Sequence, residues 1–299
     1  MNTSSMWRGV LPAITTPFTA DGAVDHDFLV QHARRMVEAG CVGMVPLGSL
    51  GEAATLSFDE KRAVMRSLVE NLDVPVIPGI ASLSTDEAVR LAREAEAIGC
   101  RGLMVLPAYV YSTDWREMGA HARAVLSATS LPCMLYNNPP AYKTDILPEQ
   151  IAELAAAHPN LQAVKESSTD VRRLTAIRHL LGDRLELLVG VDDLIVEGIA
   201  AGATGWIAGL VNAFPHESVK LFELARAGDD KAADALYHWF LPLLRMDTGP
   251  RFVQLIKLAQ ELADIGSERV RAPRLPVEGT ERVQALQQIK HAIATRPEL

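Results

Sequence analysis

Residues 39–45 read AGCVGMV, and this pattern of a glycine, two further residues, a second glycine and an apolar run returns twice in the chain. The two echoes are IGCRGLM at residues 98–104 and AGATGWI at residues 201–207. In each, we expect the first glycine to end a helix and the second to start a strand. A helix followed by a strand therefore recurs at equivalent positions of one regular architecture.

Eight short apolar runs rich in Val, Ile, Leu and Met follow one another at a steady spacing. They lie at residues 9–16, 42–48, 74–79, 102–107, 132–137, 161–166, 185–190 and 204–209. The segments between them have helical periodicity, and several begin after Asp, Ser or Thr at the capping position. Strict alternation of strand and helix implies a parallel sheet, and eight units predict an α/β fold of the closed (β/α)8 TIM-barrel type. An open doubly wound sheet competes with it, but PAITTPFTADG at 12–22 lacks the glycine-rich phosphate fingerprint of that fold.

After the eighth run the pattern changes to helices alone. These segments lie near residues 215–228, 229–246, 251–266 and 281–294. We therefore expect a catalytic barrel over residues 1–226 and a C-terminal helical extension over residues 227–299. The aromatic and leucine stripe of the extension is expected to serve packing.

Composition and charge exclude several classes of protein. The 299 residues are 48% hydrophobic and carry a net charge of −8 without long runs of either sign, which argues against a nucleic-acid partner. No apolar stretch is long enough to span a bilayer, and the first residues lack a basic segment followed by an apolar signal core. We expect a cytoplasmic protein without a membrane partner. Its three cysteines, Cys41, Cys100 and Cys133, are expected to be reduced and buried.

In a barrel of this type the catalytic residues stand at the C-terminal ends of the strands. The residues that end the apolar runs are therefore the candidates: Thr15, Thr16, Ser49, Tyr109, Tyr136, Asn137, Asn138, Lys165 and Asp192. A lysine accompanied by tyrosines and a serine suits imine chemistry, which needs neither a metal nor a cofactor.

Lys165 follows the apolar residues Leu161, Ala163 and Val164. An amine placed at the end of such a run loses its proton more readily than one in water. It can then add to a ketone, and the resulting iminium draws electrons from the neighbouring carbon, so that bonds there break or form. The phenol of Tyr136, which ends the preceding strand, can transfer the protons. The alternatives are a lysine that extends to solvent and a tyrosine that only packs in the core.

Two further features have a structural and a functional interpretation. GSLGE at residues 48–52 is either a strained turn that needs its glycines or a nest of backbone N–H groups that holds a substrate carboxylate. Asp192 and Asp193 could bind a divalent ion, but we expect them to cap the next helix. The eight histidines show no HExxH motif, so no metal site is expected.

Four ordered motifs resemble the dihydrodipicolinate synthase and N-acetylneuraminate lyase family of class I Schiff-base barrels. They are GVLPAITTPFTADGAVD at 9–25, GSLGEAATLSFDEK at 48–61, LYNNP at 135–139 and AVKESS at 163–168. The resemblance covers nearly the whole chain and implies a lyase that binds a small 2-oxo or 2-imino acid. It also implies a homo-oligomer, namely a dimer of dimers.

The resemblance assigns roles to individual residues. Lys165 matches the imine-forming lysine, and Tyr136 matches its proton-transfer partner. Ser49 matches the hydroxyl that links this tyrosine to a second one, which the neighbouring subunit supplies in the family. Tyr109 matches that second tyrosine, with Tyr111 as its rival. The residues expected to bind the substrate are Gly48, Leu50, Asn137, Asn138 and Ile207.

The sequence departs from the synthase pattern at two places. Leu50 stands where the synthase has a second threonine, and Ala141 stands where it has the arginine that fixes its second substrate, with Lys143 as a partial substitute. These departures, together with WRGVLPAITTPF at 7–18, YNNP and PLLRMDTGPRFVQLIKLA at 242–259, are similar to the branch that deaminates 1-pyrroline-4-hydroxy-2-carboxylate in hydroxyproline breakdown. We therefore predict release of ammonia and 2,5-dioxopentanoate from this substrate. The alternatives are a 4-hydroxy-tetrahydrodipicolinate synthase, a 2-keto-3-deoxy sugar acid aldolase, a metal-dependent aldolase and a barrel that only binds a 2-oxo acid.

Overall fold

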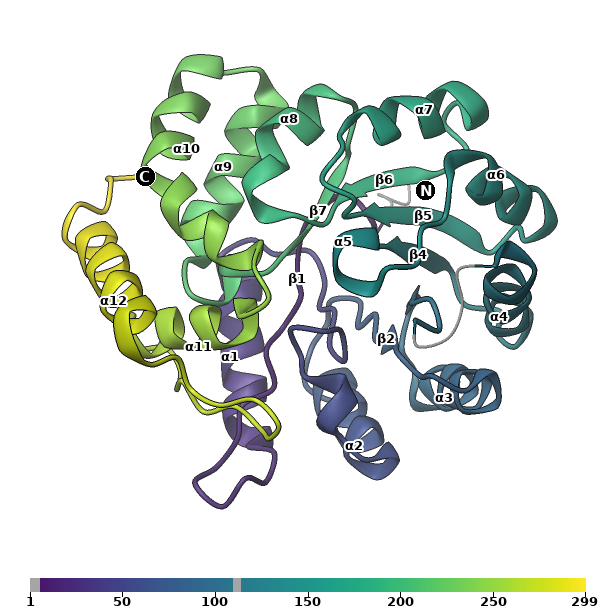
Figure 1. Cartoon of the computed structure of the whole chain (residues 1–299), viewed down its shortest axis with the longest axis horizontal. Coiled ribbons are helices and arrows are strands. Elements are labelled where there is room, and N and C mark those ends of the chain that lie inside the picture. Colours follow the sequence, from purple (N-terminus) through teal and green to yellow (C-terminus); the bar gives the residue numbers. More distant parts are fainter. Residues whose placement is uncertain (1–5, 110–113) are drawn as a thin grey trace.

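The computed structural model describes residues 6–109 and 114–299, in which seven strands form one parallel sheet surrounded by helices (Figure 1). The order of the strands in the sheet is β1-β7-β6-β5-β4-β3-β2. Their bounds are β1 Gly9–Pro12, β2 Gly79–Ile80, β3 Leu103–Val105, β4 Cys133–Asn137, β5 Leu161–Glu166, β6 Glu186–Val189 and β7 Gly205–Ala208.

The predicted strand at residues 42–48 is not a regular strand, although it lies where the barrel requires it. The Val45 amide donates to the Pro12 carbonyl at 2.9 Å, and the Met44 amide donates to the Pro75 carbonyl at 2.8 Å. The segment thus bridges β1 to the residues that lead into β2, by two isolated parallel bridges. Pro46, Pro75 and Pro78 lack the N–H groups that a continuous ladder needs. The fold is therefore a curled parallel sheet of seven strands that resembles a TIM barrel. The segment at residues 42–48 adds to this sheet through isolated bridges and not through the regular strand that was predicted.

Helices alternate with the strands, as the periodicity predicts. The helices of this part are α1 His26–Glu38, α2 Phe58–Val69, α3 Thr85–Ile98, α4 Trp115–Ser127, α5 Pro139–Tyr142, α6 Pro148–Ala157, α7 Arg172–Leu181, α8 Ile195–Ala200 and α9 Pro215–Ala227. Short 3-10 segments lie at η1 Ala53–Thr55, η2 Asp192–Leu194, η3 Leu210–Asn212 and η4 Arg245–Asp247. Helix α2 shows why the sequence folds this way, because Ser57 and Glu60 form a complete capping box at its start.

The three echoed glycines confirm the predicted helix ends. Gly40, Gly99 and Gly202 have positive φ angles of 106°, 102° and 99°, and they follow α1, α3 and α8. This left-handed conformation strains residues with a Cβ, which explains the glycine at each position. The second glycine of the last echo, Gly205, opens β7.

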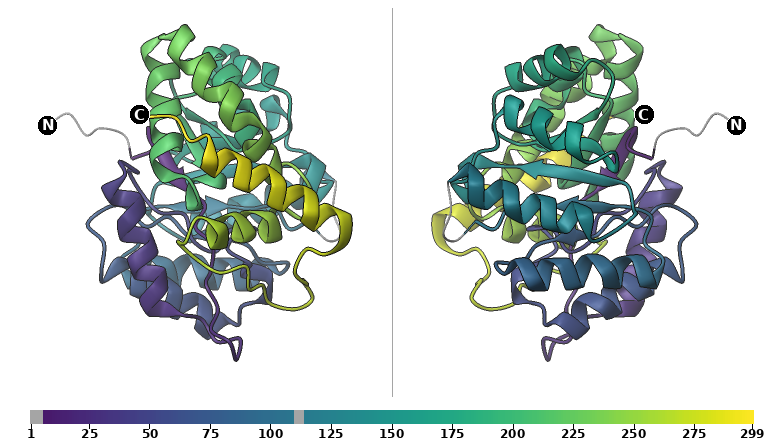
Figure 2. Two further views of the ribbon diagram at one scale, coloured as in Figure 1. Left: turned by 90° about the vertical axis from the view of Figure 1, so that its left-hand side faces the viewer. Right: turned by 90° about the vertical axis from the view of Figure 1, so that its right-hand side faces the viewer.

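Three helices follow the barrel: α10 Asp230–Leu244, α11 Phe252–Leu262 and α12 Gly279–Ala294. Helix α12 packs against α10 and α11 (Figure 2). Side chains of α11 reach the ends of the first strands, so the extension joins the barrel through buried polar contacts. The boundary at residue 227 stays a prediction. No helix in the described ranges has the length and apolar character needed to cross a membrane.

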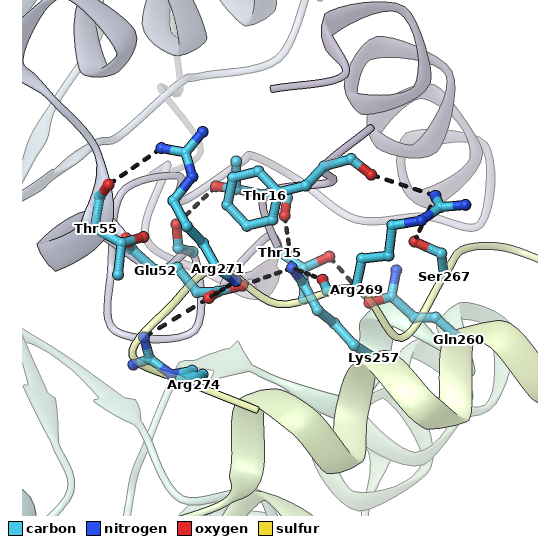
Figure 3. A network of polar contacts seen from close by, with 12 residues as sticks. Thr15, Thr16, Glu52, Thr55, Lys257, Gln260, Ser267, Arg269, Arg271 and Arg274 are labelled. Atoms are coloured by element: carbon cyan, nitrogen blue, oxygen red, sulfur yellow. Dashed lines mark hydrogen bonds and ion pairs between the residues drawn. The ribbon is translucent and has the colours of Figure 1, made fainter. Parts of the chain in front are cut away.

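One of these contacts is a buried ion pair between α11 and the GSLGE loop (Figure 3). Lys257 Nζ lies 2.6 Å from Glu52 Oε1, and their side chains are 2% and 0% exposed. The same amine donates to the carbonyls of Thr16 at 2.8 Å and Arg269 at 2.7 Å. Glu52 has a left-handed φ of 52°, which is unusual for a residue with a Cβ. The pair therefore fixes a strained loop that borders the cavity described below.

Replacing Lys257 by methionine is expected to lower the free energy of unfolding by about 3–5 kcal/mol, because Glu52 would keep a buried charge without its partner. The measurement is urea denaturation. The matched control is Arg251→Met, which removes an exposed ion pair with Glu281 and should cost less than about 1 kcal/mol. Equal effects of the two substitutions would show that the buried pair does not stabilise the loop.

A second buried contact centres on His32 of α1. Its Nε2 lies 3.2 Å from Asn212 Oδ1 and 3.2 Å from Gln260 Nε2. Burial lowers the pKa of His32 from 6.5 to about 4, although the Asn212 contact opposes this shift and the charge of Arg35 adds to it. His32 is therefore neutral in the folded protein at pH 7.

This pKa shift predicts a loss of stability in acid. Between pH 6.5 and pH 4 the unfolded chain binds a proton at His32 that the folded chain does not. The free energy of unfolding should fall by about 3 kcal/mol across this range from His32 alone. Comparing urea unfolding of the wild type and His32→Gln at pH 7 and pH 4 tests this, since the variant should lack that part of the loss. Parallel losses in both proteins would contradict it.

Candidate active site

A cavity of about 490 Å³ opens at the carboxyl ends of the strands, within the range typical of small-molecule sites. Among its lining residues are eight of the predicted ones: Gly48, Ser49, Leu50, Tyr109, Tyr136, Asn138, Lys165 and Ile207. The structure thus brings together candidates from five different strand ends or loops. Thr15 and Thr16 are buried, are not among the lining residues of the cavity, and bond to Asn212, Gln260 and Gly51 instead.

Lys165 lies on β5, and its side chain is buried except where it meets the cavity. It pairs in register with Tyr136 of the neighbouring β4, and its Nζ lies 3.9 Å from the centre of the Tyr136 ring. Gly190, after β6, leaves room for the lysine, because a Cβ there would lie 2.5 Å from Lys165 Cε. The amine is therefore held at the cavity, with a phenol beside it.

Three tyrosines form one cluster with Ser49, and sequence reasoning missed one of them. The Tyr142 hydroxyl shares a hydrogen bond with Ser49 Oγ. Tyr142 stacks on Tyr109 with ring centres 4.7 Å apart, and it meets the edge of Tyr136 at 5.7 Å. Within this chain Tyr142 contacts both Tyr136 and Tyr109, and the role of Ser49 as the link between Tyr136 and a second tyrosine stays a prediction.

The helix α5 places Tyr142 there. Asn138 caps it by accepting from the Ala141 amide at 3.1 Å, and Pro139 occupies its first turn. The same Asn138 donates from Nδ2 to the Tyr136 hydroxyl at 2.9 Å. Asn138 followed by Pro139 is a typical start of a helix. Had this signal been used, the sequence would have predicted a short helical turn after β4 that carries Tyr142. Burial, followed by the charge of Tyr136, raises the pKa of Tyr142 well above its usual range, so Tyr142 stays protonated.

Asn137 does not reach the cavity, contrary to the prediction that it binds the substrate. Its Nδ2 donates to Asp145 and Glu166 at 3.2 Å, and its Oδ1 accepts from the Ile146 amide at 3.0 Å. Successive side chains of a strand point to opposite faces, so Tyr136 and Asn137 cannot both face the site. Asn137 holds the loop after α5 in place.

Tyr109 lines the cavity of its own chain, where it stacks on Tyr142. Its rival, Tyr111, falls outside the described residues. The exchange of a tyrosine between subunits and the dimer of dimers stay predictions.

On the other side of Lys165 stand two carboxyl groups. Asp192, after β6, accepts from Trp206 Nε1 at 3.0 Å, from the Gly209 amide at 3.0 Å and from the Leu210 amide at 2.7 Å. We expected Asp192 to cap the helix that follows. It does not, because its side chain turns to the end of β7 instead. Asp247, from η4, lines the cavity. Sequence reasoning missed Asp247, which belongs to no strand.

Two more polar side chains of the cavity were not predicted. Ser167 follows Lys165 by two residues and is 1% exposed, and its Oγ has no hydrogen-bond partner among the described residues. Arg274 also lines the cavity, and its guanidinium lies 3.7 Å from Glu52 Oε2. A buried hydroxyl without a partner usually awaits a water or a ligand.

The other reactive side chains do not gather at the cavity. Within residues 6–109 and 114–299, no three His, Cys, Asp or Glu side chains are grouped so that they could hold a metal ion. Cys41, Cys100 and Cys133 are buried and unpaired, as predicted, and burial raises the pKa of each thiol to about 12. They are inert thiols of the core.

Comparison with known proteins assigns the family. The model of the dihydrodipicolinate synthetase family matches residues 6–292. The chain belongs to that family. A 4-hydroxy-tetrahydrodipicolinate synthase from Natronomonas pharaonis is 35% identical over 287 residues, which cover 94% of this chain and 96% of the relative. One from Methanothrix thermoacetophila is 33% identical over 276 residues, which cover 91% and 92%.

Solved structures of the dihydrodipicolinate synthetase family have the same fold. The 4-hydroxy-tetrahydrodipicolinate synthase from Methylacidiphilum fumariolicum has a TM-score of 0.89 at 28% identity, covering 96% of this chain and 95% of its own. A prophage protein of the family from E. coli K12, solved in complex with pyruvate, has a TM-score of 0.88 at 28% identity and covers 95% and 98%. The resemblance inferred from the four motifs is thereby confirmed at the level of the family.

Two residues that differ from the synthase pattern of the family lie at the cavity. Leu50 and Ala141, which stand where the synthase pattern has a hydroxyl and an arginine, both line the wall. Tyr142, the next residue in the chain, also lines the cavity. The cavity wall therefore differs from the synthase pattern at these two positions.

Proposed function

We propose that the protein is a class I lyase that forms an imine between Lys165 and a small 2-oxo or 2-imino acid. The observation that carries the proposal is the buried amine of Lys165 in the cavity, with its Nζ 3.9 Å from the Tyr136 ring. An amine in such a site adds to an electrophilic carbon and needs a neighbouring group to move protons. Tyr136 is that group, and Tyr142 and Ser49 connect it to the cavity wall.

The GSLGE loop supplies a site for the substrate carboxylate. The amides of Glu52 and Ala53 donate to carbonyls of the same loop, at 3.1 Å and 3.3 Å. The amides of Ser49 and Leu50 make no hydrogen bond with any described residue. Two neighbouring free N–H groups on a tight turn form an anion-binding nest. A carboxylate held there would place the adjacent C2 atom near Lys165, since both line one cavity.

The substrate that we propose is 1-pyrroline-4-hydroxy-2-carboxylate. Lys165 adds to the ring carbon C2, the C2–N bond of the ring breaks, and a linear iminium with a free amine at C5 results. Loss of a proton from C3 gives an enamine, and the hydroxyl at C4 then leaves as water. A proton then moves from C5 to C3 and another from the amine nitrogen to C4, which turns the C3–C4 double bond and the C5 amine into an imine at C5. Water hydrolyses this imine and the imine with Lys165, which releases ammonia, 2,5-dioxopentanoate and the free lysine. The free hydroxyl of Ser167 and the amide of Asn138 offer hydrogen bonds to the substrate hydroxyl, while Ala141 offers no clamp for a second carboxylate.

A second candidate is the condensation of pyruvate with aspartate semialdehyde. It is favoured by the relatives, which are named 4-hydroxy-tetrahydrodipicolinate synthase. Arg274 also favours it, because an arginine on the cavity wall can bind the carboxylate of an aldehyde substrate. Against it stand Ala141 and the engagement of Arg274 with Glu52.

One comparison of activities tests the proposal. Conversion of 1-pyrroline-4-hydroxy-2-carboxylate is followed by coupling 2,5-dioxopentanoate to a semialdehyde dehydrogenase and recording the reduced nicotinamide. Condensation of pyruvate with aspartate semialdehyde is measured on the same preparation. We expect kcat/KM to be greater for the pyrroline. A greater value for the condensation would replace the first candidate by the second.

A further inference from the structure

The cavity contains a carboxyl group that the imine chemistry alone does not use. In the sheet, Lys165 of β5 stands between Tyr136 of β4 and the end of β6. The tyrosine cluster therefore lies on one side of the amine. Asp247 reaches the cavity from the other side, where β6 and β7 end, because its Oδ1 lies against Gly209.

Gly209 makes this approach possible. A Cβ at Gly209 would collide with Asp247 Oδ1, so a larger residue would push the carboxyl group away. Gly190 leaves room in the same way, because a Cβ at Gly190 would collide with the side chains of Ser167 and Lys165. Two glycines at neighbouring strand ends thus let an amine, a hydroxyl and a carboxyl group share one wall of the cavity.

Asp247 and Asp192 are close enough to affect each other, but their surroundings differ. Asp192 is fully buried and accepts from three different N–H donors, which favour its ionised form. Burial raises the pKa of Asp192 to about 6, against these donors and the charge of Lys165. Burial, and then the charge of Asp192, raise the pKa of Asp247 well above its usual range. Two adjacent carboxyl groups cannot easily both ionise, so the three N–H donors of Asp192 favour the charge on Asp192, and that charge favours the protonated form of Asp247.

Ser167 gives independent evidence that a ligand group binds at this wall. Its Oγ is buried and has no partner among the described residues, although it lies beside Lys165 in the cavity. A hydroxyl group of the substrate would satisfy it. The wall then offers one hydrogen-bonding partner and one acid to the same substrate oxygen.

We propose that Asp247 is the general acid that protonates the departing C4 hydroxyl of the substrate, an inference that rests on the proposed deamination. In this step the enamine pair between C2 and C3 moves to form the C3–C4 double bond, and the iminium at C2 is restored. The C4–O bond breaks as the oxygen takes the proton of Asp247. Water leaves, and Asp247 is left as a carboxylate that regains its proton from solvent through the open cavity.

The test compares two leaving groups in the variant Asp247→Asn. Hydroxide leaves only with a proton, whereas chloride leaves without one. With the 4-hydroxy substrate, ammonia release should fall by about 10²–10⁴, the usual effect of losing a general acid. With the 4-chloro analogue, wild type and variant should release ammonia at rates within about threefold of each other. The matched control is Asp193→Asn, which changes a neighbouring carboxylate that does not line the cavity and pairs with Arg245.

Each outcome bears on a different claim. Equal losses with both leaving groups would show that Asp247 only supports the structure, and an undiminished rate with the 4-hydroxy substrate would show that it has no role. Either result overturns the inference and leaves the proposed function intact. If the wild type releases no ammonia from the pyrroline but is trapped by borohydride with pyruvate, the proposed substrate fails. The role of Asp247 as a hydroxyl-protonating acid then fails with it.

Discussion

Replacing Lys165 with methionine is expected to reduce turnover by about 10⁴-fold or more, to the level of a protein without a nucleophile. Methionine keeps the length of the side chain and its contacts with the barrel, so the fold should survive. The iminium cannot form, however, and no other group in the cavity can draw electrons from C3 in its place. The measurement is ammonia release under saturating substrate, together with the circular dichroism spectrum of the variant.

Two further variants sharpen this prediction. Lys165→Arg keeps a positive charge in the cavity but removes the nucleophile, since a guanidinium does not lose its proton, and it should be as inactive as the methionine variant. Lys290→Met, on the exposed face of α12, should keep full activity. Substantial activity in Lys165→Arg would mean that charge, and not a covalent imine, is what Lys165 provides.

Replacing Tyr136 with phenylalanine is expected to lower kcat by about 10²–10⁴, because the change removes only the hydroxyl that transfers protons to and from the carbinolamine. The ring remains, and so does its contact with Lys165. Removing the hydroxyl also leaves Asn138 without the acceptor that it donates to at 2.9 Å. Steady-state kinetics with the pyrroline give the measurement, and KM should change much less than kcat.

The matched control for this variant is Tyr237→Phe. The hydroxyl of Tyr237 on α10 donates to the Asp193 carbonyl, outside the cavity. Its loss should leave kcat within about twofold, since no group at the cavity loses a proton donor. If Tyr136→Phe behaves like Tyr237→Phe, Tyr136 is a packing residue.

The sequence predicted where the strand segments lie, but it did not predict that one of them forms no regular strand. All eight apolar runs lie where the barrel needs them, because alternating apolar strands and amphipathic helices follow directly from residue periodicity. The run at 42–48 lies in the right place but makes only isolated bridges, without a continuous series of backbone hydrogen bonds to its neighbours. Its own Pro46 and the prolines of the neighbouring run remove the donors, and this was visible in the sequence.

The site was predicted where strand ends determine it. The positions of Lys165 and Tyr136 at the cavity were predicted correctly because a polar residue at the end of a buried strand is easily recognised, and their catalytic roles stay predictions. Asn137 was misassigned because the alternation of faces along β4 was not applied to adjacent residues. Asp247 and Arg274 could not be placed, since they come from segments after α10 and α11 whose positions depend on tertiary packing.

Lys257 shows a limit of the same reasoning. The sequence places this lysine on an apolar helix, where a solvated side chain would be expected, yet it is 1% exposed and thus more buried than Lys165 at 6%. Only the structure shows its partner, Glu52, which is 205 residues away in the chain. The amine of Lys257 is engaged with three hydrogen-bond acceptors, and it does not line the cavity. A buried lysine is therefore a candidate nucleophile only where a cavity reaches its amine.

These two buried lysines make the central claim directly testable. The protein is incubated with pyruvate, reduced with borohydride, digested, and its peptides are analysed by mass spectrometry. We predict that the reduced adduct lies on the peptide that contains Lys165 within AVKESS, and that the peptide containing Lys257 is unmodified. An adduct on Lys257, or no adduct with pyruvate or with the pyrroline, would contradict the assignment of Lys165 as the imine-forming residue.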